Sequence, residues 1–183
     1  WTFNDLTFGN AATSGTTTRA QNATTTVSGV LTIATGHFLD AGSSAWLLSG
    51  SGDVFVEDGT FLEDTSSMTY GGTTGANILS TTYYDLVIAA SGGSPTHTFE
   101  SAALQILNDF TVGGSSVTTA TLATNDPILQ VDGDVFINSL GTLVGSDTSP
   151  LTVLGSWDNN GTYTASGGDV QFTSSDAFSI AAG

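Results

Sequence analysis

The sequence contains no cysteine and almost no basic side chain. Arg19 is the only Lys or Arg among 183 residues, against seventeen acidic residues and two histidines, and the net charge is −16. The lack of cysteine excludes disulfide stabilisation and thiol chemistry. Because affinity for phosphate backbones and anionic lipids comes from Lys and Arg, nucleic acid and lipid surfaces are not expected as partners. Salt would screen the repulsion between acidic copies.

Long hydrophobic runs are also missing. The apolar stretches are far too short to span a membrane, so membrane insertion is not expected. Gly, Ser and Thr are abundant while Glu and Lys are few, which favours many short strands joined by tight turns. No signal peptide is present and the chain starts at Trp1, so we expect a removed leader or a segment of a longer chain.

A short motif recurs: a turn residue, usually Asp, is followed by an apolar, a variable and an apolar residue. It reads NDLTF (4–8), GVLTI (29–33), GDVFV (52–56), YDLVI (84–88), NDFTV (108–112), GDVFI (133–137) and, more weakly, GSWDN (155–159). A second motif, Gly-Thr-apolar, occurs at 59–61, 141–143 and 161–163. Such internal periods indicate a repeat architecture.

The repeats predict an all-β protein, a parallel β-helix (β-solenoid) of about seven coils of 22–32 residues; an antiparallel β-sandwich is the alternative. Offsets of about 80 residues divide this single domain into two super-repeats, 1–82 and 83–183. Because alternate residues of a strand share a face, the apolar pair of each motif should point inward. These pairs are Leu6 and Phe8, Leu31 and Ile33, Val54 and Val56, Leu86 and Ile88, Phe110 and Val112, and Val135 and Ile137.

Both ends of the chain are apolar, where a solenoid normally carries polar caps. The tail from Gly161 matches the stretch from Gly59 but stops before its final strand, and the opening WTFNDLTF is a strand of that kind. Open complementary ends form a heterologous interface, which generates a fibre. We therefore predict head-to-tail self-assembly through six residues: Trp1, Phe3, Leu6, Phe8, Phe178 and Ile180.

The segments YYDLVIAASGG (83–93), LQILNDFTVGG (104–114), LQVDGDVFINSLGTLVG (129–145) and LTVLGSWDNNGTYTASGGDVQFTSS (151–175) resemble secreted, repetitive, adhesin-like β-solenoid proteins of prokaryotic cell surfaces. The resemblance covers most of residues 83–175 and is looser over 1–82. It implies an extracellular filament, matrix or surface role and no catalytic residues. The alternative is an adhesin segment that binds glycans or calcium through its lateral face.

The remaining polar residues have simpler interpretations. The recurring Asp side chains should accept backbone N–H bonds at the corners, while Asp132 and Asp134 are the best candidates for a calcium site, the one cofactor considered. His37 and His97 are interpreted as exposed loop residues, and with one arginine a polysaccharide-cleaving enzyme is not expected. Ice binding would need threonines at a fixed coil position, whereas here they cluster in residues 13–26. Asn22 and Asn160 fit the N-glycosylation sequon.

Overall fold

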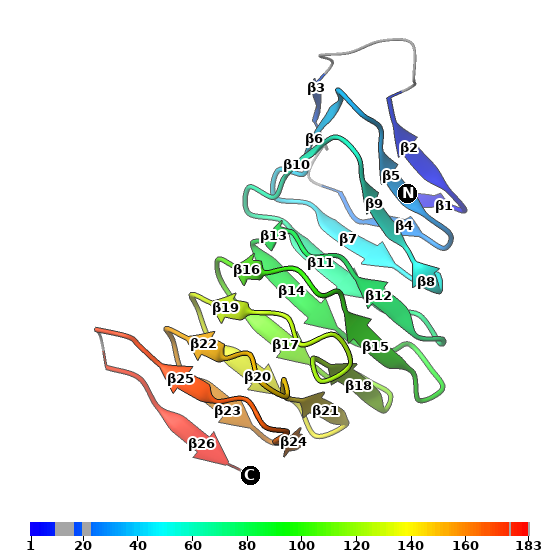
Figure 1. Cartoon of the computed structure of the whole chain (residues 1–183). Helices are drawn as coiled ribbons and strands as arrows, with labels where there is room; N and C mark the ends of the chain where they lie inside the picture. The colour runs from blue at the N-terminus through cyan, green and yellow to red at the C-terminus, as the bar shows by residue number, and fades with distance from the viewer. Residues whose placement is uncertain (10–16, 20–22, 176, 183) are drawn as a thin grey trace.

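The protein is a stack of parallel strands (Figure 1). The structure is a computed structural model, which describes residues 1–9, 17–19, 23–175 and 177–182. These residues form strands and turns, and no helix that could cross a membrane occurs among them. Every strand pair in this part of the chain is parallel. The predicted parallel β-solenoid is therefore confirmed, and the antiparallel sandwich is excluded.

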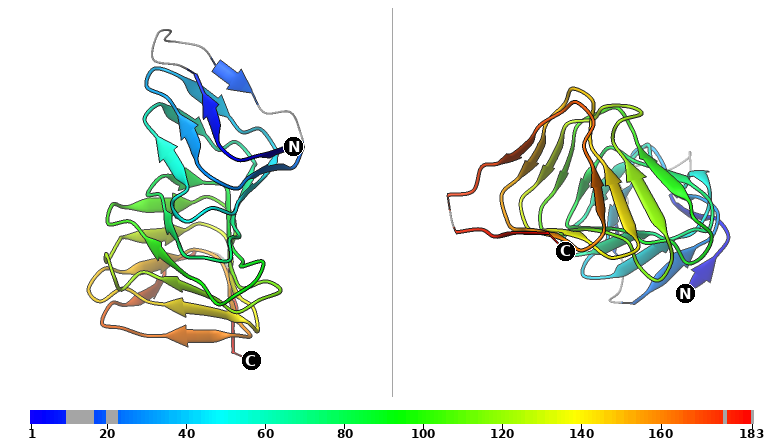
Figure 2. Two further views of the ribbon diagram at one scale, coloured as in Figure 1. Left: turned by 90° about the vertical axis from the view of Figure 1, so that its right-hand side faces the viewer. Right: turned by 90° about the horizontal axis from the view of Figure 1, so that it is seen from below.

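One nine-stranded sheet runs along the whole stack. Each of its strands belongs to a successive turn of the chain, so neighbours in space lie about two dozen residues apart in sequence (Figures 1 and 2). Its strands are β1 (Thr2–Phe3), β4 (Thr25–Val27), β7 (Ala45–Leu48), β11 (Ser67–Tyr70), β14 (Asp85–Ile88), β17 (Phe110–Val112), β20 (Val135–Ile137), β23 (Trp157–Asn159) and β26 (Ile180–Ala182).

The other two faces of the solenoid each divide into two sheets. The second face begins as a three-stranded sheet of β2 (Leu6–Phe8), β5 (Leu31–Ile33) and β9 (Phe55–Glu57). It continues as a six-stranded sheet of β8 (Gly52–Asp53), β12 (Ala76–Ile78), β15 (Thr96–Phe99), β18 (Thr118–Thr121), β21 (Gly141–Val144) and β24 (Thr162–Thr164). The third face begins as β3 (Thr17–Arg19), β6 (Phe38–Asp40) and β10 (Thr60–Leu62). It continues as a five-stranded sheet of β13 (Thr82–Tyr83), β16 (Leu104–Ile106), β19 (Leu129–Val131), β22 (Leu151–Val153) and β25 (Val170–Phe172).

The sequence motif changes face at this division. Asp5 precedes β2 on the second face, whereas Asp85 begins β14 in the nine-stranded sheet. The 32-residue interval between Asp53 and Asp85 is therefore not one long coil, and the motif moves from one face to another within it. Steps along the nine-stranded sheet run from 18 residues (Thr69 to Val87) to 25 residues (Thr111 to Phe136).

The nine-stranded sheet contributes two continuous apolar columns to the core, which the inward residues of the other two faces complete. In-register neighbours bury each other, and every member of the two columns is at most 6 % exposed. Burying a side chain of this size contributes about 1.5–3 kcal/mol. One column holds Trp46, Met68, Leu86, Phe110, Val135 and Trp157, and the other holds Leu48, Tyr70, Ile88, Val112 and Ile137.

The inward pairs are as expected except in the third motif and at the first coil. In β9 the residue opposite Leu31 is Phe55 and the residue opposite Thr32 is Val56, so Val56 points outward. The prediction for Val56 was wrong by one residue, because Val54 lies at the corner before the strand and is buried there. Leu6 and Phe8 are only partly buried, since no coil covers them from the other side in the described residues.

A buried tyrosine pair lies where the third face changes sheet. The hydroxyls of Tyr70 and Tyr83 are 2.9 Å apart. The Tyr83 hydroxyl donates to the Leu79 carbonyl (2.8 Å), and the Leu79 N–H donates to the Tyr70 oxygen (3.3 Å). Burial raises the pKa of both tyrosines, so both stay neutral donors and acceptors at ordinary pH. The pair thus closes the short turn between β12 and β13 with every polar group satisfied.

Candidate functional site

Aspartates at one corner of the nine-stranded sheet bond each coil to the next. The Asp109 N–H donates to Asp85 Oδ1 (3.2 Å), and the Asp134 N–H donates to Asp109 Oδ1 (3.0 Å). The Ser156 N–H continues the series to Asp134 Oδ1 (2.6 Å). Each carboxylate therefore accepts the N–H of its counterpart one coil further on. The prediction that these side chains accept backbone N–H bonds is confirmed, and these bonds offset the repulsion between stacked charges.

The same bond occurs once on the second face. Asp5 Oδ1 accepts the N–H of Val30 (2.8 Å), and the series stops there because Val30 has no acceptor side chain. Asp53 instead accepts the side-chain amide of Asn77 (2.5 Å). The recurring aspartates thus have structural roles in both halves of the molecule.

The candidate calcium ligands Asp132 and Asp134 are occupied by hydrogen bonds. The side-chain amides of Gln105 (2.7 Å) and Gln130 (2.6 Å) donate to the two oxygens of Asp132. Asp134 receives the N–H of Ser156. No group of three or more His, Cys, Asp or Glu side chains that could hold a metal occurs among the described residues. Calcium binding at Asp132 and Asp134 stays a prediction, and the described residues bring no third acidic or histidine ligand to the pair.

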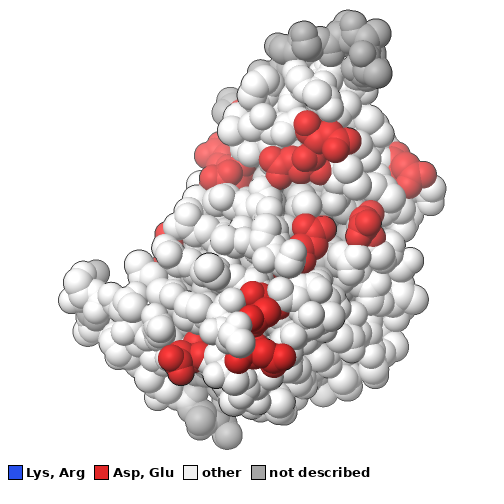
Figure 3. Space-filling model, in the orientation of Figure 1, with Lys and Arg blue, Asp and Glu red and all other residues white. Residues whose placement is uncertain are grey.

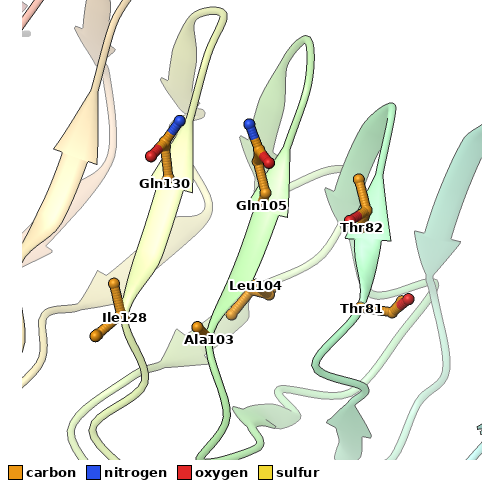
Figure 4. Close-up of a pocket in the computed structure, with 7 residues that line it drawn as sticks. All are labelled: Thr81, Thr82, Ala103, Leu104, Gln105, Ile128 and Gln130. Atoms are coloured by element: carbon orange, nitrogen blue, oxygen red, sulfur yellow. The ribbon is translucent and has the colours of Figure 1, made fainter.

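A shallow groove of about 370 Å³ lies beside these glutamines on the outer face of the five-stranded sheet (Figure 4). Gln105 and Gln130 are in register on β16 and β19, and Thr82 continues the row on β13. The buried Leu104 and the exposed Ile128 also line the groove. The groove offers amide and hydroxyl groups to a ligand and no ionisable side chain among its lining residues.

The residues predicted to form the N-terminal half of the assembly interface gather at one end of the stack. Trp1 is 70 % exposed, and Phe3, Leu6 and Phe8 are partly buried. Phe8 packs edge-to-face against Trp46, with ring centroids 6.1 Å apart. In the described residues β1 and β2 are end strands that pair on one side only. This end therefore presents both apolar side chains and strand edges.

The C-terminal end holds an aromatic cluster. Trp157 contacts Tyr163 (5.2 Å between ring centroids) and Phe172 (6.2 Å), and Phe178 stacks on Phe172 (5.3 Å). Phe178 is 42 % exposed and Ile180 is 61 % exposed. Ile180 belongs to β26, which pairs with β23, so the tail includes its own last strand. The interpretation that the tail stops before that strand was wrong.

Both histidines lie inside the protein, so their interpretation as exposed loop residues was wrong. His37 is 2 % and His97 0 % exposed. The Ala76 N–H donates to His97 Nδ1 (3.3 Å), and His97 Nε2 is buried without a hydrogen-bond partner. Burial lowers the pKa of His97 to about 4, so the ring is neutral at pH 7. The alternating pattern of β15 accounts for this, because His97 and Phe99 both point inward.

The acidic side chains are spread along the molecule. On the face shown in Figure 3 they lie in separate groups with uncharged surface between them. One of the aspartates is held by a turn: Asp126 accepts the hydroxyl of Thr148 and the N–H groups of Asp147, Thr148 and Ser149. These bonds lower the pKa of Asp126 to about 2. The side chain of Arg19 and the sequon at Asn22 lie outside what the structure describes.

The outer face of the six-stranded sheet carries two columns of threonine that sequence reasoning missed. Thr96, Thr119, Thr142 and Thr162 are in register on β15, β18, β21 and β24. The second column, two residues further along each strand, holds Thr98, Thr121, Val144 and Thr164. We call these eight residues the threonine face. Of the threonines in residues 13–26, only Thr13 and Thr16 lie outside the described residues, whereas Thr17 and Thr18 belong to β3 and Thr25 and Thr26 to β4.

The chain matches no protein-family model, no curated protein and no solved structure. The fold and the surfaces above therefore stand on the geometry of this molecule alone. They define a parallel β-solenoid with apolar ends, acidic corners and one uncharged threonine face.

Proposed function

We propose that the protein is a structural unit of an extracellular filament or surface fibre, in which β-solenoid ends stack head to tail. The next coil comes from a second copy or from adjoining chain. The observation that supports this most directly is that β1 and β26 are the two end strands of the same nine-stranded sheet. A strand placed against each would extend one parallel ladder. The two surfaces are different, so repeated stacking gives an open fibre and not a closed pair.

The exposed apolar residues support the same arrangement. Trp1 at one end and Phe178 and Ile180 at the other keep between 42 % and 70 % of their surface in water. Burying apolar surface stabilises association by about 25 cal/mol per Å². The placement on a prokaryotic cell surface rests on the resemblance to secreted repetitive solenoids. No catalytic role is part of the proposal.

Two charge substitutions at matched exposed isoleucines test this. Ile180 (61 % exposed) lies in the end strand β26, whereas Ile128 (53 % exposed) lies on a lateral face beside the groove. Ile180→Lys should abolish fibres and higher oligomers in electron microscopy and sedimentation velocity, and Ile128→Lys should leave them unchanged. A wild-type chain that stays monomeric at high concentration would refute the proposal, as would equal effects of the two variants.

A further inference from the structure

The side chains of the threonine face are regularly spaced in two directions. Adjacent strands lie ~4.8 Å apart, and residues two apart on one strand are separated by ~6.7 Å. The eight side chains therefore form a nearly rectangular array of four rows and two columns. Val144 keeps the array intact in shape, because valine differs from threonine by a methyl in place of the hydroxyl. The β-branched side chains have few rotamers, so the array is fixed before any ligand arrives.

This face is uncharged in a strongly acidic protein. The strands β15, β18, β21 and β24 contain no Asp, Glu, Lys or Arg, although the chain carries seventeen acids. The only ionisable side chains of these strands, His97 and Tyr163, lie at inward positions between the two columns. An outward face without charge has little to attract an ionic partner. Its free groups are hydroxyls and methyls.

The hydroxyls of the threonine face are free of hydrogen bonds in the described part of the chain. Other threonines bond the backbone, as Thr118 does with Ser116 and Ala90. The array threonines make no side-chain hydrogen bond within the described residues. Thr121 shows this most clearly: it is only 8 % exposed, it lies between its neighbours Thr98 and Val144, and its hydroxyl makes no hydrogen bond to the described residues. The Thr121 hydroxyl is not fully buried, so it opens onto the face and is satisfied by water there.

We propose that the threonine face binds ice. Its occupant is a lattice of water molecules, held in register by the rows of hydroxyls and packed against the methyl groups between them. The repeat of the array resembles the oxygen repeat on the prism faces of hexagonal ice. A sugar or peptide ligand would need a concave site with convergent polar groups, and the groove of this molecule lies on the five-stranded sheet instead. This function is independent of head-to-tail stacking, since the face is lateral.

The test measures ice recrystallisation and the partition of the protein into a growing ice hemisphere. The wild-type chain should inhibit recrystallisation and enter the ice. Thr119→Tyr and Thr142→Tyr, in the centre of the face, should abolish both effects, because the ring holds the surface away from the lattice. Thr142→Val should retain most of the activity, as Val144 already does within the array.

A matched control is Thr111→Tyr, an outward, partly buried threonine of the nine-stranded sheet. It should behave as wild type. Circular dichroism melts show that each variant is folded. A wild-type chain that is excluded from ice would overturn the proposal whatever the variants do, and so would an equal loss in Thr111→Tyr. Fibre formation by Thr119→Tyr should be unchanged, which separates this face from the proposed assembly.

Discussion

Replacing Gly133 by alanine should destabilise the protein, although a glycine-to-alanine change at a compatible position normally stabilises a folded chain. It stands at the corner before Asp134, against the preceding coil. A Cβ at this position would lie 2.4 Å from the carbonyl oxygen and 2.6 Å from the carbonyl carbon of Asn108. Both atoms belong to the backbone, so no side-chain rotation can relieve the contact. The two coils must separate locally.

The cost follows from the bonds that cross this contact. The Gly133 N–H donates to the Asn108 carbonyl (3.0 Å), and the Asp134 N–H donates to Asp109 Oδ1 (3.0 Å). A neutral hydrogen bond contributes about 0.5–1.5 kcal/mol and one to a charged acceptor about 1.5–3 kcal/mol. The lower conformational entropy of the unfolded chain with alanine offsets about 0.4–1 kcal/mol of this loss. We expect Gly133→Ala to lose about 2–3 kcal/mol, or about 5–10 °C in Tm.

The matched control is Gly92→Ala. Its Cβ would meet only the Cγ2 methyl of Thr73, at 3.3 Å, and a side chain can move. We expect its stability to be unchanged or raised by up to about 1 kcal/mol. Urea unfolding followed by circular dichroism measures both variants, and similar m-values show that the same surface unfolds. If Gly133→Ala proves as stable as Gly92→Ala, the close register of neighbouring coils is wrong.

Three further outcomes follow from the structure. Because the folded pKa of His97 is about 4 and the unfolded one about 6.5, the unfolded chain binds more protons between these values. The free energy of unfolding should therefore fall by up to about 3 kcal/mol as the pH drops from 6.5 to 4. Urea unfolding of the wild type and of His97→Leu at both pH values measures this, and an equal fall in the variant would contradict it. Tyr70→Phe removes the buried hydrogen bond to the Tyr83 hydroxyl and the acceptor of the partly buried Leu79 N–H, and should cost about 1–3 kcal/mol in thermal unfolding. Tyr84→Phe, at a partly buried position nearby, should cost little, and equal losses would argue against the pair. Head-to-tail stacking of chains that each carry a net charge of −16 should strengthen as salt rises from about 0.01 M to 1 M, because the Debye length falls from ~30 Å to ~3 Å. Sedimentation velocity measures this, and weaker association at high salt would show that attraction between charges drives the stacking.

The fold could be predicted because one local rule repeats. Alternating apolar residues after a turn residue placed Leu86, Ile88, Phe110 and Val112 in the core, where they are fully buried. The spacing of the motifs gives the length of a coil, but it does not say on which face a motif lies. The change of face between Asp53 and Asp85 was therefore invisible, because identical patterns occur on both sides of it.

The errors at single residues have a common cause. His97 was judged by its polar side chain, whereas its place in the alternation of Thr-His-Thr-Phe puts it beside Phe99 on the inner face. The threonine face was missed because the alternation within each strand was not followed there either. The pattern Thr-x-Thr occurs in the sequence at 96–98, 119–121 and 162–164. Its alignment between strands depends on the number of residues from one strand to the next coil's strand, which varies from 20 to 23.

The nine-stranded sheet decides how the proposed units would join. It alone, among the described residues, contains strands from both ends, since the other two faces change sheet at β8–β13. β26 of one unit would meet β1 of the next within this sheet. However, β1 has only two residues, Thr2 and Phe3, so edge pairing can supply few hydrogen bonds. Most of the free energy of joining must then come from burial of Phe178, Ile180 and Trp1. For this reason a lysine at Ile180 perturbs the joint more sharply than a proline in β1 would.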